Sequence, residues 1–230
     1  MPWVNHPKPL SRLKAALVPK GEARRRVVTG AFRGLSFEMD LRRQLQLFLG
    51  LHERELYRYL RTLSRGIRSA VDVGAADGEY ALYFLLRAKA EFVIAVEPVA
   101  DLRAAVHRNV KFNSRGKGTL EVCPYFVAEA DGADRRTLDS LASGLDTPCL
   151  IKVDVDGGEL DVLRGSTVML GRAGVRWLIE THSQDLEREC LRILGQAGHQ
   201  CRVVPNAWWR IIVPEMRPIP HNRWLVAWKP

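Results

Sequence analysis

The segment that decides the fold is Ser69-Ala70-Val71-Asp72-Val73-Gly74-Ala75-Ala76-Asp77-Gly78. Residues 69–73 form a short, mainly apolar run, which is typical of a buried strand. A glycine turn follows at once, and the apolar pattern of residues 79–87 predicts a helix. Gly74 permits a tight turn, and Gly78 permits close approach of a helix to a strand. In open α/β sheets, the turn that follows a strand in this way lies at the edge where ligands bind.

Short apolar runs and helical patterns alternate through the rest of the chain. The predicted strands are residues 69–73, 92–96, 120–122, 125–127, 150–153, 177–180, 201–204 and 224–228. The predicted helices are residues 79–87, 100–112, 159–164 and 186–197. This alternation predicts an α/β fold with a doubly wound, mostly parallel, Rossmann-like sheet.

The first third of the chain differs from the rest in pattern and in charge. Alternation around Gly30 and Gly34 predicts a hairpin at 27–39, and helical spacing over 41–63 is broken at Gly50. Residues 1–70 hold 15 Lys and Arg against 5 Asp and Glu, although the whole chain has a net charge of only +9. We therefore expect a basic tail and helical or hairpin cap over residues 1–66, followed by a ligand-binding domain over 67–230.

The basic excess has two interpretations. A solvated, arginine-rich surface is the simpler one. The run Arg24-Arg25-Arg26 would also suit an acidic ligand, an anionic surface or a nucleic acid.

Composition excludes several other classes of protein. Hydrophobic residues make up 47% of the chain and charged residues 27%, as in globular proteins. The longest apolar run, residues 80–86, is far shorter than the roughly 20 residues that span a bilayer. The first ten residues lack the apolar core of a signal peptide. The four cysteines form no C-x-x-C pair, so we expect free thiols, no membrane span and a cytoplasmic location.

Glu97 ends the second predicted strand and precedes Pro98. An acid at that position can accept hydrogen bonds from both hydroxyls of a ribose, as it does in dinucleotide sites. An exposed acid before a proline is the alternative interpretation. Combined with the glycine turn, Glu97 favours a site for a nucleoside.

The turn itself indicates which nucleoside. A dinucleotide site needs a middle glycine beside the pyrophosphate, but Ala75 and Ala76 stand there and Asp77 adds negative charge. S-adenosylmethionine has no phosphate, and its sulfonium and ammonium groups suit Asp72 and Asp77. The turn therefore favours S-adenosylmethionine over NAD or FAD.

A second group of polar residues follows two later strands. Residues 151–160 read Ile-Lys-Val-Asp-Val-Asp-Gly-Gly-Glu-Leu, and Asp154 should point into the ligand cleft. Lys152 lies inside an apolar strand and should be paired with an acid. Glu159 opens the next helix, where the helix dipole alone would favour a carboxylate. Glu180 and His182 share one face of a further strand, and a purely structural role for His182 is the alternative to catalysis.

Five motifs in order resemble the FkbM-type methyltransferases, a branch of the class I S-adenosylmethionine-dependent enzymes. They are Asp72 to Gly78, Glu97-Pro98, Thr137-Leu138-Asp139, Lys152 to Gly165, and Ile179-Glu180-Thr181-His182. The resemblance spans about residues 30–228. It departs from the family pattern at Ala76, where the family usually has Asn, and at Asp156, where it usually has Glu.

The resemblance implies methyl transfer from S-adenosylmethionine, most often to a hydroxyl oxygen of a sugar or secondary metabolite. The expected cofactor-binding residues are Asp72, Gly74, Ala75, Asp77, Gly78, Glu97 and Asp154. His182 is the first candidate for the base and Asp154 the second. In a third, less favoured arrangement, Asp154, Asp156 and Glu180 would hold Mg²⁺.

Two other functions remain open at this stage. The basic first third suits an RNA methyltransferase, although no N/D-P-P-Y/F/W run and no separate RNA-binding module is present. The change at Ala76 permits a nucleoside-binding scaffold without catalysis. We expect a small hydroxylated substrate and no nucleic-acid partner; the sequence indicates neither the acceptor nor the oligomeric state.

Overall fold

The computed structural model describes residues 18–113, 117–211 and 221–229. The chain forms two compact units, Met1–Arg54 and Glu55–Pro230. The boundary precedes the one expected after residue 66, because helix α3 (Tyr57–Leu63) contacts strand β9 (Val175–Thr181) and so belongs to the second unit.

The first unit contains a hairpin and a helix. Strand β1 (Glu22–Arg26) pairs antiparallel with β2 (Ser36–Asp40), and α2 (Leu41–Leu49) follows. The expected hairpin is confirmed, but its first strand precedes residue 27 because residues 27–35 form the connecting loop. Helix α2 ends at Gly50 in the left-handed conformation (φ 68°), which is the break that the sequence predicted.

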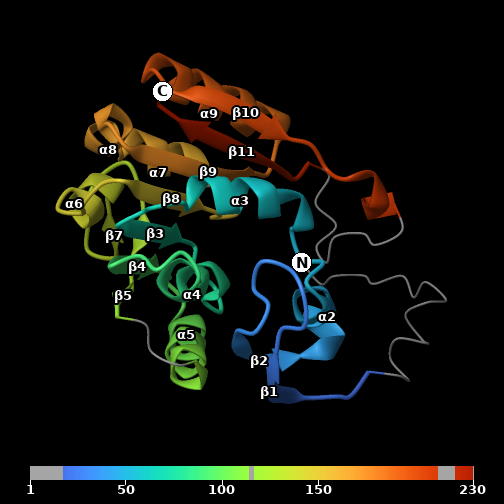
Figure 1. Ribbon diagram of the computed structural model, residues 1–230. Coiled ribbons are helices and arrows are strands. Elements are labelled where there is room, and N and C mark those ends of the chain that lie inside the picture. Colours follow the sequence, from blue (N-terminus) through green and yellow to red (C-terminus); the bar gives the residue numbers. More distant parts are fainter. Residues whose placement is uncertain (1–17, 114–116, 212–220, 230) are drawn as a thin grey trace. The chain divides into compact units, whose positions relative to one another are not determined.

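The second unit is built around a seven-stranded sheet with the order β10-β11-β9-β8-β3-β4-β5 (Figure 1). The five strands from β9 to β5 are parallel, whereas β11 is antiparallel to both of its neighbours. The remaining bounds are β3 (Ser69–Val73), β4 (Phe92–Val96), β5 (Thr119–Cys123), β8 (Cys149–Val153), β10 (Gln200–Val204) and β11 (Arg223–Trp228). All residues of the central strands β3 and β8 are buried, as in sheets that helices cover on both faces.

Helices cover both faces of this sheet (Figure 1). Helix α4 (Glu79–Leu86) packs on β3 and β4, and α9 (Gln184–Gln196) packs on β9, β10 and β11. The other helices are α5 (Ala100–Phe112), α6 (Leu138–Ala142), α7 (Glu159–Arg164) and α8 (Thr167–Gly171), with single 3₁₀ turns at η1 (Arg54–Leu56) and η2 (Trp208–Ile211). A separate parallel pair joins β6 (Phe126–Val127) to β7 (Arg135–Arg136).

The doubly wound, mostly parallel sheet is therefore confirmed. The sequence did not indicate α6, α8 or β7, which have only two to five residues each and too little periodicity to detect. All four cysteines are free thiols. Within the described ranges, no helix is long and apolar enough to cross a bilayer.

The glycine turn is held by close backbone contact between two strand ends. Gly74 has φ 76°, and a Cβ atom added to it would lie 1.9 Å from the carbonyl oxygen of Asp154. Gly78 has φ 86°, and an added Cβ would lie 3.2 Å from a methyl group of Val106 on α5. Gly74 is thus required by both its conformation and its contact.

We expect Gly74→Ala to destabilise the fold, because the methyl group collides with backbone and the left-handed conformation disfavours alanine. Gly195→Ala, at an exposed position of α9 with nothing within 4 Å, is the matched control. It should raise the free energy of unfolding by about 0.5–1 kcal/mol, because alanine favours helix. Denaturant unfolding of both variants tests this expectation, and equal stability of the two would contradict it.

Candidate functional site

Four chain positions form one row across the carboxyl edge of the sheet. Val73 pairs with both Val96 and Val153, and Val153 pairs with Ile179. The next residue on each of these strands therefore lies in the same row. These residues are Glu97 directly after β4, Gly74 directly after β3, Asp154 directly after β8, and Glu180 within β9. The structure thus brings together the predicted residues that follow separate strands.

Lys152 connects the strands beneath this row. It is 3% exposed, and its Nζ donates a hydrogen bond to the carbonyl oxygen of Gly74 (2.8 Å) and lies 3.1 Å from Asp72 Oδ1. The same Nζ lies 3.8 Å from Asp154 Oδ2 and 5.2 Å from the ring centroid of Tyr80. The expected pairing of Lys152 with an acid is confirmed.

Asp72 lies inside the protein and not at its surface. It has no exposed area, and its Oδ2 accepts a hydrogen bond from the backbone N–H of Ala81 in the first turn of α4. Burial raises the pKa of the Asp72 carboxyl, and the positive charge of Lys152 opposes that shift. The direct contact of Asp72 with a cofactor stays a prediction. Asp72 connects β3 to the first turn of α4 through Ala81 and to β8 through Lys152.

Glu97 lies directly beside the glycine turn. Glu97 is only 4% exposed. Its Oε2 accepts a hydrogen bond from the N–H of Ala76 and its Oε1 accepts one from the N–H of Val99, both at 2.9 Å. Arg103 also donates to the carbonyl oxygens of Glu97 and Pro98. A carboxylate has about four acceptor positions, so two remain for a ligand. The alternative of a merely exposed acid is wrong.

The backbone donors of the turn are largely used within the fold. The N–H groups of Gly74 and Ala75 both bond to the carbonyl oxygen of Val96, and Gly78 N–H bonds to the carbonyl oxygen of Ala75. These donors are therefore not directed at an external anion. Such a turn suits a ligand without a pyrophosphate, as its sequence predicted. Ala76 is exposed at the tip, whereas Asp77 is half-buried and its carbonyl oxygen accepts a hydrogen bond from Asn109.

His182 lies among carboxylates from three segments. Its Nδ1 is 2.7 Å from Glu159 Oε1, and its Nε2 is 3.5 Å from Glu180 Oε2. Nε2 is also 3.7 Å from Asp154 Oδ1 and 3.4 Å from Asp156 Oδ1. Burial by itself lowers the pKa of His182, but Glu159 and Glu180 outweigh it and raise that pKa to about 10. An imidazole in this environment is a cation and not a free base.

Glu159 has a more specific role than the helix dipole suggested. It has no exposed area, and its Oε1 accepts the N–H of Gly157 (2.9 Å) and also contacts His182. Gly157 has φ 112°, a conformation that favours glycine, and this turns the chain so that Glu159 reaches back. The sequence placed Glu159 at a helix start but gave no sign of its contact with His182, because the two are 23 positions apart.

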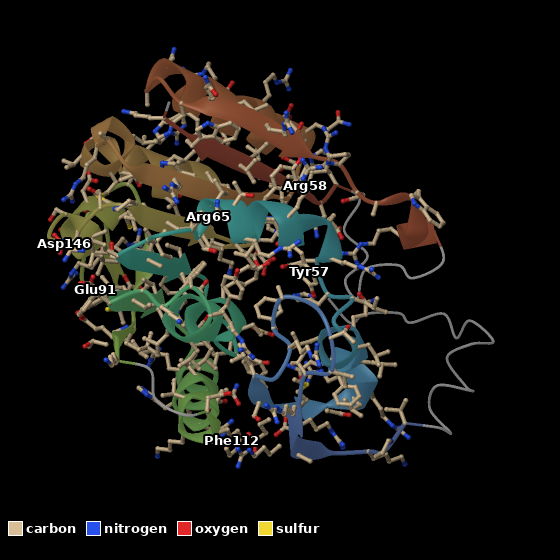
Figure 2. All side chains as sticks on the ribbon, in the orientation of Figure 1. Tyr57, Arg58, Arg65, Glu91, Phe112 and Asp146 are labelled. Atoms are coloured by element: carbon tan, nitrogen blue, oxygen red, sulfur yellow. The ribbon has the colours of Figure 1, made fainter. Side chains whose placement is uncertain are left out.

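The opposite edge of the sheet carries a separate feature. Arg68 Nη2 lies 3.1 Å from Glu91 and 3.0 Å from Asp146, and both acids appear at the same side of the fold in Figure 2. A cavity of about 410 Å³ opens there, lined in part by Phe92 and Glu121. Because Ser69 and Phe92 begin their strands, this cavity lies at the amino edge and away from the row described above.

Several solved structures with a similar fold are methyltransferases. A methyltransferase FkbM from Methylobacillus flagellatus has a TM-score of 0.55 and 20% identity over 70% of this chain and 43% of that chain. A putative methyltransferase, yhhF, from Escherichia coli has a TM-score of 0.51 and 12% identity over 90% and 98% of the two chains. TYW2 from M. jannaschii, solved in complex with AdoMet, has a TM-score of 0.50 and 12% identity over 91% and 85%.

These similarities establish the Rossmann-like fold of class I methyltransferases, which the sequence predicted. A methyltransferase named FkbM, like the family whose motifs this sequence resembles, is among the similar structures, although this chain spans less than half of its length. No protein-family model matches the sequence, and no curated protein matches it.

Lys152→Met tests the buried ion pair. Removing one partner leaves the Asp72 charge uncompensated, so we expect a loss of about 3–5 kcal/mol in the free energy of unfolding. Adding Asp72→Asn should recover part of that loss, because Asn keeps an acceptor for Ala81 N–H. Lys111→Met, at an exposed position of α5, is the control. The free energies of unfolding are measured in urea. If the losses caused by Lys152→Met and Asp72→Asn simply add in the double variant, the two side chains are not paired.

Proposed function

We propose that this protein is an S-adenosylmethionine-dependent methyltransferase that methylates a hydroxyl oxygen of a sugar or secondary metabolite. The observation that carries the proposal is the position of Glu97. It directly follows β4 beside the glycine turn, in the same row as Asp154, at the carboxyl edge of a class I methyltransferase sheet. Ligands of open α/β sheets bind at that edge.

The donor and acceptor chemistry of the site fits S-adenosylmethionine. Glu97 keeps acceptor positions that would hold the ribose hydroxyls, and the turn directs few donors outward, in keeping with a ligand that lacks phosphate. Gly74, Ala75, Asp77 and Gly78 would form the wall beside the nucleoside and the positive amino-acid end. When bound, S-adenosylmethionine supplies an electrophilic methyl group on a sulfonium sulfur.

The remaining residues of the row would act on the acceptor substrate, whose hydroxyl receives the methyl group. The hydroxyl must lose its proton to a positioned group that can accept it. His182 Nδ1 is engaged by Glu159, and its Nε2 faces three carboxylates, so His182 is poorly suited to accept that proton. We therefore assign the proton to Asp154, which is 17% exposed at its side chain, and give His182 the role of holding the surrounding carboxylates.

Support for a hydroxyl acceptor comes from the five motifs that resemble the FkbM family and from the FkbM methyltransferase among the similar folds. RNA methylation is the second candidate, and β1 favours it because Arg24 and Arg26 are exposed on that strand. Both functions use the same cofactor edge, so acceptor assays must distinguish them.

Glu97→Ala should weaken S-adenosylmethionine binding by about 2 kcal/mol, or roughly 30-fold, because hydrogen bonds to a charged group are lost. Isothermal titration calorimetry measures the affinity. Glu91→Ala is the matched control, since Glu91 precedes the same strand at the opposite edge, is exposed and pairs with Arg68. Its affinity should equal that of the wild type.

A second measurement separates lost binding from lost folding, because Glu97 also holds two backbone N–H groups. Wild-type protein should bind an analogue lacking the ribose 2′-hydroxyl more weakly than S-adenosylmethionine. Folded Glu97→Ala should bind both with nearly equal affinity. Full affinity in folded Glu97→Ala would overturn the assignment.

Asp154→Asn should lower turnover by about 10²–10⁴-fold, because it removes the proposed proton acceptor. Methyl release should be followed on a panel of hydroxylated acceptors and a short RNA, with exposed Asp161→Asn as control. If only the RNA is methylated, RNA methylation becomes the assigned function in place of methylation of a small hydroxylated acceptor. Cofactor binding without turnover on any acceptor would favour the scaffold, and full activity of Asp154→Asn would remove Asp154 as the base.

A further inference from the structure

We propose that Asp154, Glu180 and His182 form a binding site for a divalent first-row transition-metal cation such as Mn²⁺. The three side chains come from the ends of β8 and β9, in and next to the row at the carboxyl edge. The proposal concerns binding by the chain's own side chains and does not depend on methyl transfer.

The spacing of the candidate ligand atoms fits a cation. One atom from each of the three residues lies within 4.8 Å of the others. His182 Nε2 is 3.7 Å from Asp154 Oδ1 and 3.5 Å from Glu180 Oε2. Ligand atoms about 2.1 Å from one cation are about 3.0–3.4 Å apart in octahedral or tetrahedral geometry. The two distances from Nε2 lie a few tenths of an ångström above that range, whereas a pair at the 4.8 Å limit would have to close by more than 1 Å when the cation binds.

The burial and contacts of the His182 ring nitrogens give a second observation that supports a metal site. Its side chain is 8% exposed, and its Nε2 is buried without a hydrogen-bond partner among the described residues. Its Nδ1 contacts Glu159 at 2.7 Å. Histidines that bind metals usually donate their other ring N–H to a carboxylate or carbonyl, which fixes the ring and its tautomer. Glu159 supplies that contact and leaves Nε2 directed at the carboxylates. A bound cation would displace the Nε2 proton of the imidazolium to solvent, because the ligand must be the neutral ring.

The charge around this cluster favours a cation as well. The carboxylates of Asp154, Asp156, Glu159 and Glu180 all lie within 4 Å of the His182 ring nitrogens. Lys152 Nζ lies 3.8 Å from Asp154 Oδ2, but it is also hydrogen-bonded to Gly74 and lies closer to Asp72, at 3.1 Å. Bringing a divalent cation into the cluster would offset the mutual repulsion of these acids.

The ligand types indicate the class of metal. An imidazole nitrogen with two carboxylates suits Mn²⁺, Fe²⁺ or Zn²⁺, whereas an all-oxygen set suits Mg²⁺ or Ca²⁺. The site differs in this respect from the Mg²⁺ arrangement considered from sequence, since His182 replaces Asp156 among the ligands. Asp156 is 63% exposed at its side chain and lies at the rim of the cluster. Asp154 would bind through Oδ1, which leaves Oδ2 for the role proposed above.

Mn²⁺ titration followed by electron paramagnetic resonance tests the site directly. The full, tag-free chain is stripped with a chelator, and the signal of free Mn²⁺ reports binding. We expect a single site in the wild type, and pulsed measurements should show coupling to a ¹⁴N nucleus from the histidine ligand. S-adenosylmethionine is left out, so the result is independent of the proposed function.

Variants then assign the ligands. Glu180→Gln should abolish the site, and Glu159→Gln should weaken it by about 10–100-fold through the histidine that it orients. Asp185→Asn, 86% exposed on α9, should bind as the wild type does. Thermal unfolding checks that each variant folds. If a variant does not fold, the ¹⁴N coupling in the wild type still tests whether a histidine binds the Mn²⁺. No Mn²⁺ binding at millimolar concentration, no ¹⁴N coupling, or full binding by folded Glu180→Gln would each overturn the proposal.

Discussion

The ligand edge depends on one buried cation. Lys152 comes from β8, but its Nζ bonds to the carbonyl oxygen of Gly74 in the loop after β3 and pairs with Asp72 inside β3. Asp72 in turn accepts the N–H of Ala81 at the start of α4. A single charged group thus fixes two adjacent strands, the turn between strand and helix, and the helix itself. Breaking such a buried pair leaves a charge without a partner or solvent, so separating these elements is costly.

Carboxylates gather at the same edge of the sheet, beside this turn. Gly74 lets the Asp154 carbonyl approach closely, and the strand register then places Glu97, Asp154 and Glu180 in one row. Glu97 lies on one side of the turn and the His182 cluster on the other. The edge is therefore divided into a half suited to ribose hydroxyls and a half suited to positive charge.

Much of this could be predicted from sequence, because the strands are short, apolar and ended by glycines or acids. The expected bounds of β3, β4, α5 and α7 match the structure. Contacts between residues far apart in the sequence could not be predicted in this way. The burial of Asp72, the contact of Glu159 with His182 and the antiparallel position of β11 all depend on strand order and register.

The two departures from the FkbM pattern show the same limit. Ala76 and Asp156 both have positive φ, 45° and 51°, a conformation that Asn adopts more readily than Ala. The sequence showed that a side-chain amide was missing at position 76 but not that the backbone there is left-handed. The substitution therefore affects the conformation of the turn as well as its contacts.

A crystal structure of the protein with S-adenosylhomocysteine would test the central claim most directly. The account predicts the ribose hydroxyls within hydrogen-bonding distance of Glu97, with the sulfur over the glycine turn on the side of Asp154. A nucleoside bound at the opposite edge, near Arg68 and Glu91, or a ribose that makes no contact with Glu97, would contradict it.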